Sequence, residues 1–270
     1  MRSLISSLSN ANKALWRAIQ AVAMDIDGTL TSQGTFPAEV VKALYELRSS
    51  GLKLVLVTGR PSGWVQALAS YLPVDAAIAE NGGVVFLGRE SAPFVRNPID
   101  ATFTHTGAAD FRPPLKTMFE SLLNKYPFLE ITEDNVYRLS DYTFKVKDLS
   151  SEMLLKMKTI VESCGLAFTW STIHAHIMPQ GQQKGATLQW LLQQWNMSSH
   201  PAHTTLTVGD SPNDVTLFDN QRFPCSAGVA NILKYRALMP NFPQVISGGL
   251  EGDGFVEIAQ TLLQLRSEKP

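Results

Sequence analysis

Cysteine is scarce in this chain. Only two cysteines, Cys164 and Cys225, occur among 270 residues. They are too few and too far apart to indicate a disulfide framework or a zinc cluster. Reduced thiols are the default for such an isolated pair, and reduced thiols are typical of the cytoplasm. The cysteine content therefore predicts a cytoplasmic protein without a disulfide scaffold.

Charge of either sign is also sparse. Charged residues make up 17% of the chain, and the formal net charge is -1. The sequence therefore lacks the basic field that nucleic-acid binding requires. It also lacks a run of like charges that would indicate an interaction tail. We expect no nucleic acid among the partners of this protein.

Long apolar runs are missing as well. No stretch is long enough to span a bilayer, and residues 1–20 lack the continuous apolar segment of a secretory signal. We expect no membrane partner, and we interpret residues 1–20 as an amphipathic helix or an arm before the first strand. The hydrophobic fraction of 44% still supports a real core in a chain of 270 residues, which allows one large domain or two small ones.

One apolar run ends in acidic residues. Residues 22–31 read VAMDIDGTLT, which predicts a buried strand followed by Asp25, Asp27 and Gly28. If the strand ends near Met24, both carboxylates emerge at its carboxyl end, where open parallel sheets bind their ligands. The glycine allows a sharp turn there. A loop with two turn-forming aspartates is the alternative interpretation of this segment alone.

Three later segments fit the first one. They are residues 54–60 (LVLVTGR), 183–188 (QKGATL) and 205–214 (TLTVGDSPND). Thr58 ends a second predicted strand, Lys184 opens a predicted helix, and Asp210 ends a third strand. Each segment is a weak signal alone, whereas the ordered set is specific. Together they resemble the haloacid dehalogenase-like phosphatase superfamily, and in particular its Cof-like, class IIB branch, which includes sugar phosphatases.

The pattern of helices and strands changes between the second and third motifs. Strands and helices alternate over residues 36–79, which implies right-handed crossovers and a parallel sheet. From residue 84 to residue 179 the order becomes helix then strands, twice over. The expected helices are 114–126 and 151–164, and the expected strands are 84–87, 129–132, 136–139, 142–147, 166–171 and 173–178.

This αββ-αββ order matches the class IIB cap of the family that the motifs resemble. We therefore expect an α/β fold with a doubly wound, Rossmann-like core and an inserted α+β cap. The expected divisions are an N-terminal extension over residues 1–20, a core formed by residues 21–83 and 180–270, and a cap over residues 84–179.

Period-two alternation divides the expected cap strands into two faces. Tyr142 and Phe144 share an apolar face that should lie under the helices. His174 and His176 lie on the opposite face, together with Trp170 in our interpretation. A basic and aromatic platform suits a phosphorylated or hydroxyl-rich substrate, and an ordinary solvated sheet face is the alternative. Relatives often carry an acidic residue in place of His176, so this position departs from the family pattern.

The two aspartates of the first motif have distinct expected roles, which the resemblance also implies. Asp25 is the expected nucleophile, which would form an aspartyl-phosphate. Asp27 is the expected general acid for the leaving oxygen and then the base for water. Repulsion between two nearby carboxylates raises the pKa of one, which helps to keep an acid protonated near neutral pH.

Mg²⁺ is the expected cofactor because it prefers oxygen ligands and retains several waters. The expected ligands are the carboxylates of Asp25 and Asp210 and the main-chain carbonyl of Asp27, with Asp214 acting through water or from an outer position. Lys184 would add a positive charge against Asp25 and the phosphate. An exposed helix lysine is the alternative for that residue alone.

Several residues are expected to bind the substrate. The Thr58 hydroxyl and nearby main-chain N–H groups, including that of Gly59, would bind phosphate oxygens. Asn213 is a further phosphate donor by resemblance to Cof-like relatives. Asn81 and His176 are candidates for contact with the substrate.

The sequence thus predicts a Mg²⁺-dependent phosphatase for a small phosphorylated metabolite, in the first place a sugar phosphate. The alternatives are a sucrose-phosphate or mannosyl-phosphoglycerate phosphatase, a phosphomannomutase-like phosphotransferase, and a non-catalytic regulator that binds a sugar phosphate. The phosphomannomutases share an arginine soon after the first motif. Residues 32–34 of this chain read SQG instead, which favours hydrolysis. The core motifs do not choose the substrate, and the sequence does not indicate an oligomeric state.

Overall fold

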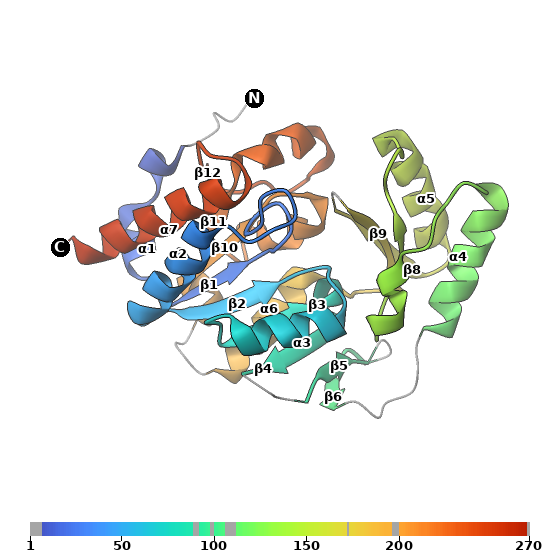
Figure 1. Ribbon diagram of the computed structural model, residues 1–270, viewed down its shortest axis with the longest axis horizontal. Helices are drawn as coiled ribbons and strands as arrows, with labels where there is room; N and C mark the ends of the chain where they lie inside the picture. The colour runs from blue at the N-terminus through green and yellow to red at the C-terminus, as the bar shows by residue number, and fades with distance from the viewer. Residues whose placement is uncertain are drawn as a thin grey trace.

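The computed structural model contains two separate sheets (Figure 1). It describes residues 7–88, 92–97, 100–105, 112–171, 173–195 and 200–268. The larger sheet has nine strands in the order β12-β11-β10-β1-β2-β3-β4-β5-β6, and the smaller has three in the order β7-β9-β8. The predicted α/β core with an inserted cap is confirmed.

The larger sheet is parallel from β12 to β3 and antiparallel from β3 to β6. Its strands are β1 (Ala21–Met24), β2 (Lys53–Val57), β3 (Ala76–Ala79), β4 (Val84–Leu87), β5 (Phe94–Arg96), β6 (Phe103–His105), β10 (Thr205–Gly209), β11 (Cys225–Gly228) and β12 (Val245–Ile246). Met24 pairs with Leu56 on one side and Val208 on the other. This register brings the carboxyl ends of β2, β1 and β10 to one edge of the sheet.

Helices cover both faces of the core sheet. One face packs against α1 (Lys13–Arg17), α2 (Ala38–Ser49), α3 (Ser62–Tyr71) and α7 (Glu251–Ser267). The other packs against α6 (Lys184–Gln194) and the 3-10 helices η5 (Pro212–Leu217) and η6 (Ala230–Leu238). Shorter 3-10 helices are η1 (Leu8–Asn10), η2 (Glu80–Gly82) and η4 (Pro201–Thr204). Both sheet faces are thus buried, as expected for a doubly wound core.

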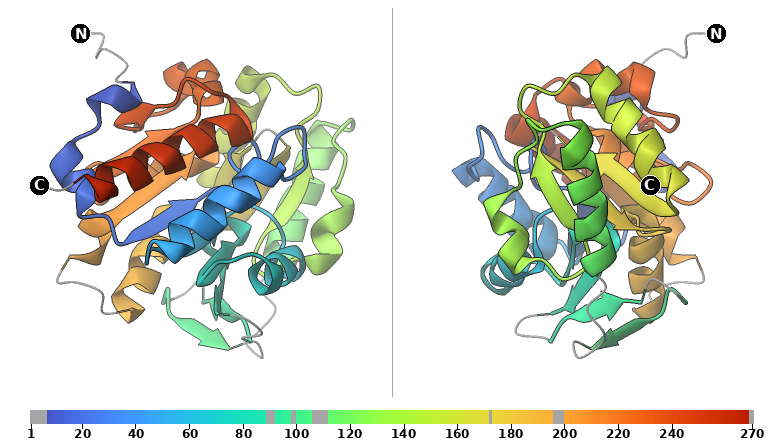
Figure 2. Two further views of the ribbon diagram at one scale, coloured as in Figure 1. Left: turned by 60° about the vertical axis from the view of Figure 1, so that its left-hand side comes forward. Right: turned by 90° about the vertical axis from the view of Figure 1, so that its right-hand side faces the viewer.

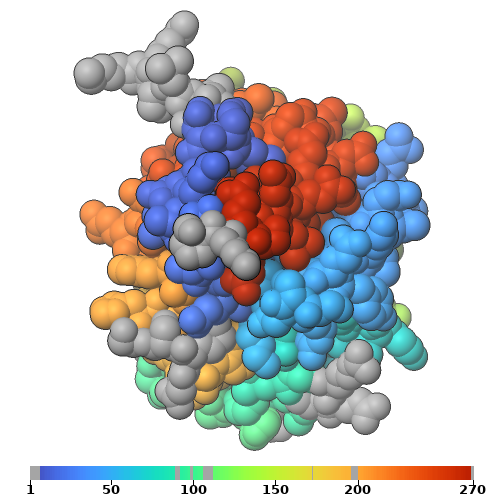
Figure 3. All heavy atoms as spheres, turned by 90° about the vertical axis from the view of Figure 1, so that its left-hand side faces the viewer, coloured from blue at the N-terminus to red at the C-terminus, as the bar shows by residue number. Residues whose placement is uncertain are grey.

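The described part of the N-terminal extension is packed onto the core. Ser7 forms an isolated parallel bridge with Ile246. Helix α1 packs against α7, and Figure 3 shows the blue N-terminal segment beside the red C-terminal helix. Trp16 is only 3% exposed, and Arg17 donates a hydrogen bond to the main-chain carbonyl of Leu265 at 3.2 Å.

The cap consists of an antiparallel sheet with two helices on one side. Its elements are α4 (Pro113–Lys125), the 3-10 helix η3 (Glu133–Tyr137), β7 (Tyr142–Lys145), α5 (Ser151–Ser163), β8 (Leu166–Trp170) and β9 (His174–Pro179). Figures 1 and 2 show α4 and α5 on the side of the cap sheet that is turned away from the core. Tyr142 and Phe144 lie in the apolar cluster under these helices, as predicted. Trp170 belongs to the same cluster, so its expected place on the opposite face is wrong.

The cap strand expected at residues 136–139 is wrong. Glu133–Tyr137 forms η3 instead. The Asn135 side chain donates hydrogen bonds to the carbonyls of Thr132 and Thr143 and accepts one from the Thr143 N–H. Such side-chain bonds to the main chain compete with strand pairing. The strand expected just before this segment is reduced to one isolated bridge in the structure, between Ile131 and Phe144.

Strands β4, β5 and β6 continue the core sheet rather than the cap sheet. β4 pairs with β3, β5 with β4, and β6 with β5. The expected boundary between core and cap at residue 84 therefore differs from the boundary that the strand pairing indicates. We propose that the cap begins after His105, the last residue of β6. No helix among the described residues is both long and apolar enough to cross a bilayer.

Candidate active site

The site lies where three neighbouring strands of the core sheet end. Asp25 follows β1, Thr58 follows β2 and Asp210 follows β10. All three side chains are buried. Gly28 turns the chain just after β1 with φ +79°, and a Cβ there would lie 2.7 Å from the Asp210 carboxylate. The turn therefore requires glycine for both its backbone conformation and its close contact.

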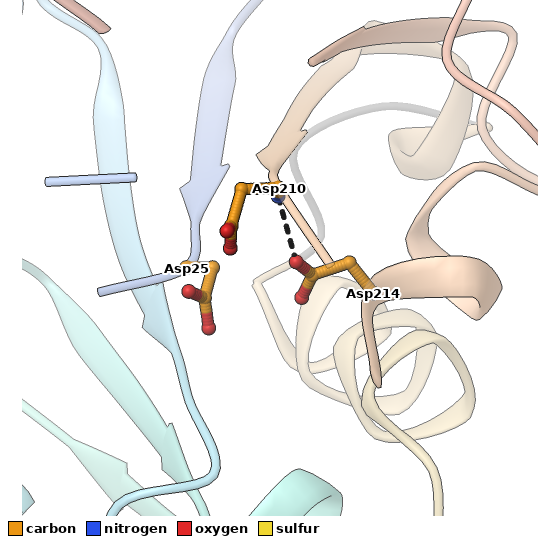
Figure 4. Close-up of side chains that lie close together, drawn as sticks. All are labelled: Asp25, Asp210 and Asp214. Atoms are coloured by element: carbon orange, nitrogen blue, oxygen red, sulfur yellow. Dashed lines mark hydrogen bonds between the residues drawn. The ribbon is translucent and has the colours of Figure 1, made fainter. Parts of the chain in front are cut away.

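Three carboxylates form a buried acidic cluster. One oxygen each from Asp25, Asp210 and Asp214 lies within 4.8 Å of the other two. Figure 4 shows the three side chains pointing toward a common space, with the Asp210 N–H donating to the Asp214 carboxylate at 2.9 Å. The Ser211 N–H donates to the same oxygen at 3.2 Å. These main-chain bonds fix Asp214 behind the other two carboxylates.

Lys184 lies between two of these carboxylates. Its Nζ is 2.5 Å from Asp25 Oδ1 and 2.6 Å from Asp214 Oδ1. The side chain is fully buried, so an exposed helix lysine is excluded. Burial alone would lower the pKa of Lys184, but Asp214 and Asp25 raise it above its usual value. The first residue of α6 is therefore a permanent cation inside the cluster.

The cluster still has more negative than positive charge. Burial, opposed by Lys184 and reinforced by Asp214, raises the pKa of Asp25 to about 8. Burial and the neighbouring Asp25 also raise the pKa of Asp210 well above its usual value. Buried carboxylates with raised pKa values are stabilised by a bound cation.

The donor set fits a divalent cation that prefers oxygen ligands. Asp210 Oδ1 is buried and has no hydrogen-bond partner in the described part of the chain, while Asp210 Oδ2 accepts from Asn231 at 2.8 Å. Both oxygens of Asp214 accept hydrogen bonds, one from Lys184 and one from main-chain N–H groups. Asp25 and Asp210 thus have the carboxylate oxygens that could bind a metal ion directly, whereas both oxygens of Asp214 are already hydrogen-bonded.

Asp27 is held by an arginine that the sequence analysis did not assign to the site. Arg60 Nε and Nη2 donate to the two Asp27 oxygens at 2.7 and 2.6 Å. The Arg60 guanidinium in turn stacks on Trp64, with its central carbon 5.1 Å from the ring centroid. Bidentate pairing stabilises the ionised carboxylate. A proton-donating role for Asp27 would therefore require it to leave Arg60 first.

The expected phosphate-binding residues lie beside these aspartates. The Thr58 hydroxyl accepts from the Arg60 N–H at 3.1 Å. Asn213 Nδ2 donates to Asn81 Oδ1 at 3.2 Å. A Cβ on Gly59 would lie 3.1 Å from Asn81 Nδ2, so this part of the chain passes very close to the asparagine.

The cap and the core meet through a buried glutamate at the end of β3. Glu80 accepts hydrogen bonds from the N–H groups of Ser62 in the core and of Leu139 and Ser140 in the cap, at 2.6 to 3.0 Å. The Ser140 hydroxyl also donates to Glu80. A core carboxylate thus orders the loop that leads into β7.

A second connection between the cap and the core is made by Arg138, to which the sequence analysis gave no role. Arg138 is fully buried and forms ion pairs with Asp134 and Asp141. Its Nη1 also donates to the main-chain carbonyl of Gly59 at 3.0 Å. Asp134, Arg138 and Asp141 lie in or beside residues 136–139, which we interpreted as a strand, and the sequence analysis gave them no role.

His176 reaches the site from the cap sheet. It is 1% exposed, and its Nδ1 lies 2.8 Å from Asp141 Oδ2. Burial, Arg138 and Lys184 lower the pKa of His176 well below its usual range, so the ring is neutral. The face of the cap sheet that carries His176 packs on the core, which excludes the interpretation as a solvated face.

Two cavities border the site. One, about 10 Å³ in volume, is lined by Asp25, Asp27, Gly59, Arg60, Ser171, Ile173, His174, His176 and Asn213. The other, about 280 Å³, lies between cap and core and is bordered by Asn81, Lys184 and Asn213 on the core side. Phe168, Trp170 and Met178 are among its cap residues. The larger cavity thus adjoins Lys184, Asn213 and Asn81.

Comparison with known proteins agrees with this architecture. Residues 22–106 and 106–231 match the haloacid dehalogenase-like hydrolase family. A phosphoglycolate phosphatase from Pyrobaculum aerophilum is 28% identical over 254 residues, which cover 91% of this chain and 96% of that protein.

Two solved structures share the fold. A protein of Thermoplasma acidophilum superposes with a TM-score of 0.69 at 21% identity, covering 92% of this chain and 99% of that one. A class IIB sugar phosphatase superposes with a TM-score of 0.62 at 15% identity, covering 91% and 99% of the two chains. The chain therefore belongs to the haloacid dehalogenase-like hydrolases, in their Cof-like class IIB branch, and is a phosphatase of the phosphoric monoester hydrolase class.

Proposed function

We propose that this protein hydrolyses a small phosphate monoester in a Mg²⁺-dependent reaction that passes through an aspartyl-phosphate. The observation that carries the proposal is the contact of Lys184 with Asp25 and Asp214 inside a cluster that also contains Asp210. A nucleophile, a permanent cation and unpaired carboxylate oxygen thus lie within one buried space. Phosphoryl transfer requires this kind of preorganised charge.

The reaction has two steps. In the first, an Asp25 oxygen attacks phosphorus, the bond from phosphorus to the ester oxygen breaks, and Asp27 donates a proton to the departing alcohol. In the second, water attacks the aspartyl-phosphate while Asp27 accepts its proton, which releases phosphate and regenerates Asp25. In the described structure Arg60 holds both Asp27 oxygens at 2.7 and 2.6 Å, so Asp27 would leave Arg60 and take up a proton before the first step.

Asp25 and Asp210 would hold the metal ion, together with the main-chain carbonyl of Asp27. The ion would neutralise charge on the transferring phosphoryl group. Lys184 orients Asp25 through its 2.5 Å contact and supplies positive charge of its own. Asn213 and the Thr58 hydroxyl are close enough to the Asp25 end of the sheet to bind phosphate oxygens.

We propose a sugar phosphate as the substrate, and phosphoglycolate as the second candidate. The 280 Å³ cavity beside Lys184 supports a leaving group of sugar size, because ligand cavities of about 300 Å³ are at the small end of the usual range. The similarity to a phosphoglycolate phosphatase over 91% of the chain supports the second candidate. Phosphotransfer to a second sugar remains an alternative outcome of the same assay.

The test is phosphate release from a panel of sugar phosphates, phosphoglycolate and phosphoglycerates, with Mg²⁺ and with a chelator. We expect the chelator to abolish turnover and Asp25→Asn to reduce it by about a thousandfold or more, because the nucleophile is removed. Asp253→Asn is the matched control, since Asp253 is an exposed residue of α7. Full turnover by Asp25→Asn, or by the wild type in chelator, would contradict the proposal.

A further inference from the structure

A buried chain of three side chains fixes the orientation of His176. Arg138 Nη1 donates to both oxygens of Asp141 at 3.0 Å, and Asp141 Oδ2 lies 2.8 Å from His176 Nδ1. All three residues are at most 2% exposed. His176 therefore has one orientation in the described structure.

The chain also determines which ring nitrogen carries the proton. An ionised carboxylate only accepts hydrogen bonds, and both Asp141 oxygens already accept from Arg138. Nδ1 of His176 must then be the donor of the 2.8 Å bond. In a neutral ring the other nitrogen, Nε2, carries no proton and acts as an acceptor.

Nε2 lies beside Gly59, close to a donor that has no partner. A Cβ built on Gly59 would lie 3.1 Å from His176 Nε2 and 3.1 Å from Asn81 Nδ2. Nε2 has no hydrogen-bond partner among the described residues. Asn81 is 1% exposed, and its buried Nδ2 has no hydrogen-bond partner among the described residues. The acceptor Nε2 and the donor Nδ2 thus both lie against the main chain at Gly59, where even a methyl group would be too close to each of them.

We propose that His176 and Asn81 together recognise a hydroxyl group on the leaving group of the substrate. This inference rests on the proposed phosphatase function and narrows its substrate class. A hydroxyl can donate to Nε2 and accept from Nδ2 at a single oxygen. Carboxylate and phosphate dianion oxygens only accept, and they would face the Nε2 lone pair without a hydrogen bond. The pair therefore selects hydroxylated phosphate esters over phosphoglycolate.

The kinetic test compares esters that differ only in hydroxyl groups. Glycerol 1-phosphate and n-propyl phosphate have the same carbon chain, and phosphoglycolate replaces hydroxyls with a carboxylate. We expect wild-type kcat/KM to be at least about tenfold higher for glycerol 1-phosphate than for n-propyl phosphate, because a site built for a hydroxyl rejects the analogue that lacks it. His176→Phe should abolish that ratio, because the acceptor for the hydroxyl is removed.

Asp141→Asn provides a sharper variant. Arg138 requires an acceptor at residue 141, so the Asn oxygen would face Arg138 and its NH₂ group would face His176 Nδ1. Nδ1 then becomes the acceptor and the proton moves to Nε2. We expect this variant to lose the preference for glycerol 1-phosphate and to gain relative activity on phosphoglycolate. His203→Gln, at an exposed residue, is the control.

Nitrogen NMR gives a readout that a merely structural role would not move. The chain has five histidines, so His176→Gln identifies the signals of His176. We expect a protonated Nδ1 and an unprotonated Nε2 in the wild type, and the reverse in Asp141→Asn. A wild-type Nε2–H tautomer, or equal kcat/KM for the two neutral-chain esters, would overturn the inference while leaving the phosphatase proposal intact. Absence of Asp25-dependent turnover on every ester would overturn both.

Discussion

At the scale of single residues, the acidic cluster makes cation binding and proton binding compete. Burial raises the pKa of Asp25 to about 8, and the negative charges of Asp214 and Asp27 add to this rise. Lys184 opposes this effect but is shared with Asp214. Below pH 8 the folded protein without metal therefore keeps a proton on Asp25 that the unfolded chain loses near pH 4.

We predict that Mg²⁺ uptake releases protons and that Mg²⁺ affinity rises from pH 6 to pH 8. The folded-state pKa of Asp25 is raised, so the protonated form dominates at pH 6 and must be displaced by the metal. Calorimetric titration in two buffers with different ionisation enthalpies measures the released protons. Without metal, the same linkage lowers the free energy of unfolding as the pH rises from about 4 to 8.

Asp25→Asn provides the control for this prediction. The amide does not titrate in this range, so proton release on Mg²⁺ binding should fall relative to the wild type. An affinity that is independent of pH between 6 and 8 in the wild type would show that Asp25 is already ionised in the metal-free protein.

Residues within local motifs were predictable, whereas residues that meet through the fold were not. Asp25, Lys184 and Asp210 each follow or open a regular element at the carboxyl edge of the sheet, so a strand-by-strand interpretation brings them together. The Arg138 network is different, because its contact with the carbonyl of Gly59 spans 79 positions. Nothing in the local pattern of either segment indicates that contact.

At the scale of elements, the start of α6 must approach η5 closely for Lys184 to reach the cluster. Gly185 is the second residue of α6, and a Cβ there would lie 2.3 Å from the main-chain carbonyl oxygen of Thr216. Gly63 is the second residue of α3, and a Cβ there would meet Tyr137 at an ordinary 3.4 Å. The two glycines occupy equivalent helix positions in different surroundings.

We predict opposite effects for alanine at these two glycines. Gly185→Ala should destabilise the protein by about 1–3 kcal/mol, because the contact with Thr216 forces a backbone shift. It should also lower kcat, because Lys184 moves with the helix. Gly63→Ala should be neutral or stabilising by up to about 1 kcal/mol, because alanine restricts the unfolded chain and favours the helix.

Urea denaturation and initial rates of phosphate release measure both effects. Equal stability changes for the two variants would contradict the prediction, since both remove a glycine from the same position of a helix. An unchanged kcat in Gly185→Ala would show that the helix start can shift without moving Lys184.

Element boundaries also show where prediction from the sequence fails. The strands that end at the site were predicted because they are continuous apolar runs. β5 and β6 have three residues each and carry polar residues, so their sequences do not differ from a loop. β5 pairs with β4, and β6 pairs with β5, so both extend the antiparallel edge of the core sheet. Tertiary packing decides which of the two sheets they join.

At the scale of the whole molecule, the site lies between the core and the cap, which meet through buried polar residues. The smaller cavity, of about 10 Å³, holds no more than about one water molecule. A phosphate ester therefore enters only when the cap moves away from the core. Glu80 and Arg138 bridge the two bodies at the loop before β7, and the motion must preserve or exchange those bonds.

The N-terminal extension lies at the other end of the core sheet. Trp16 comes shortly before β1, whose carboxyl end leads to Asp25, so the tryptophan packs near the amino end of the same strand. Arg266 of α7 donates to the carbonyl of Ile19 in this region. The described part of the extension, residues 7–20, thus packs against the core at the end of the sheet opposite Asp25.

We predict that Trp16→Ala destabilises the protein by about 3 kcal/mol or more, because a buried aromatic side chain is replaced by a cavity. The kcat of the folded variant should equal that of the wild type, because the catalytic edge of the sheet is unchanged. Urea denaturation followed by circular dichroism measures the first effect, and phosphate release below the transition measures the second. Tyr71→Ala is the control, since Tyr71 is 83% exposed and should cost little. Wild-type stability in Trp16→Ala would show that the extension is dispensable for the core, and a lowered kcat in the folded variant would show that it acts on the site through β1.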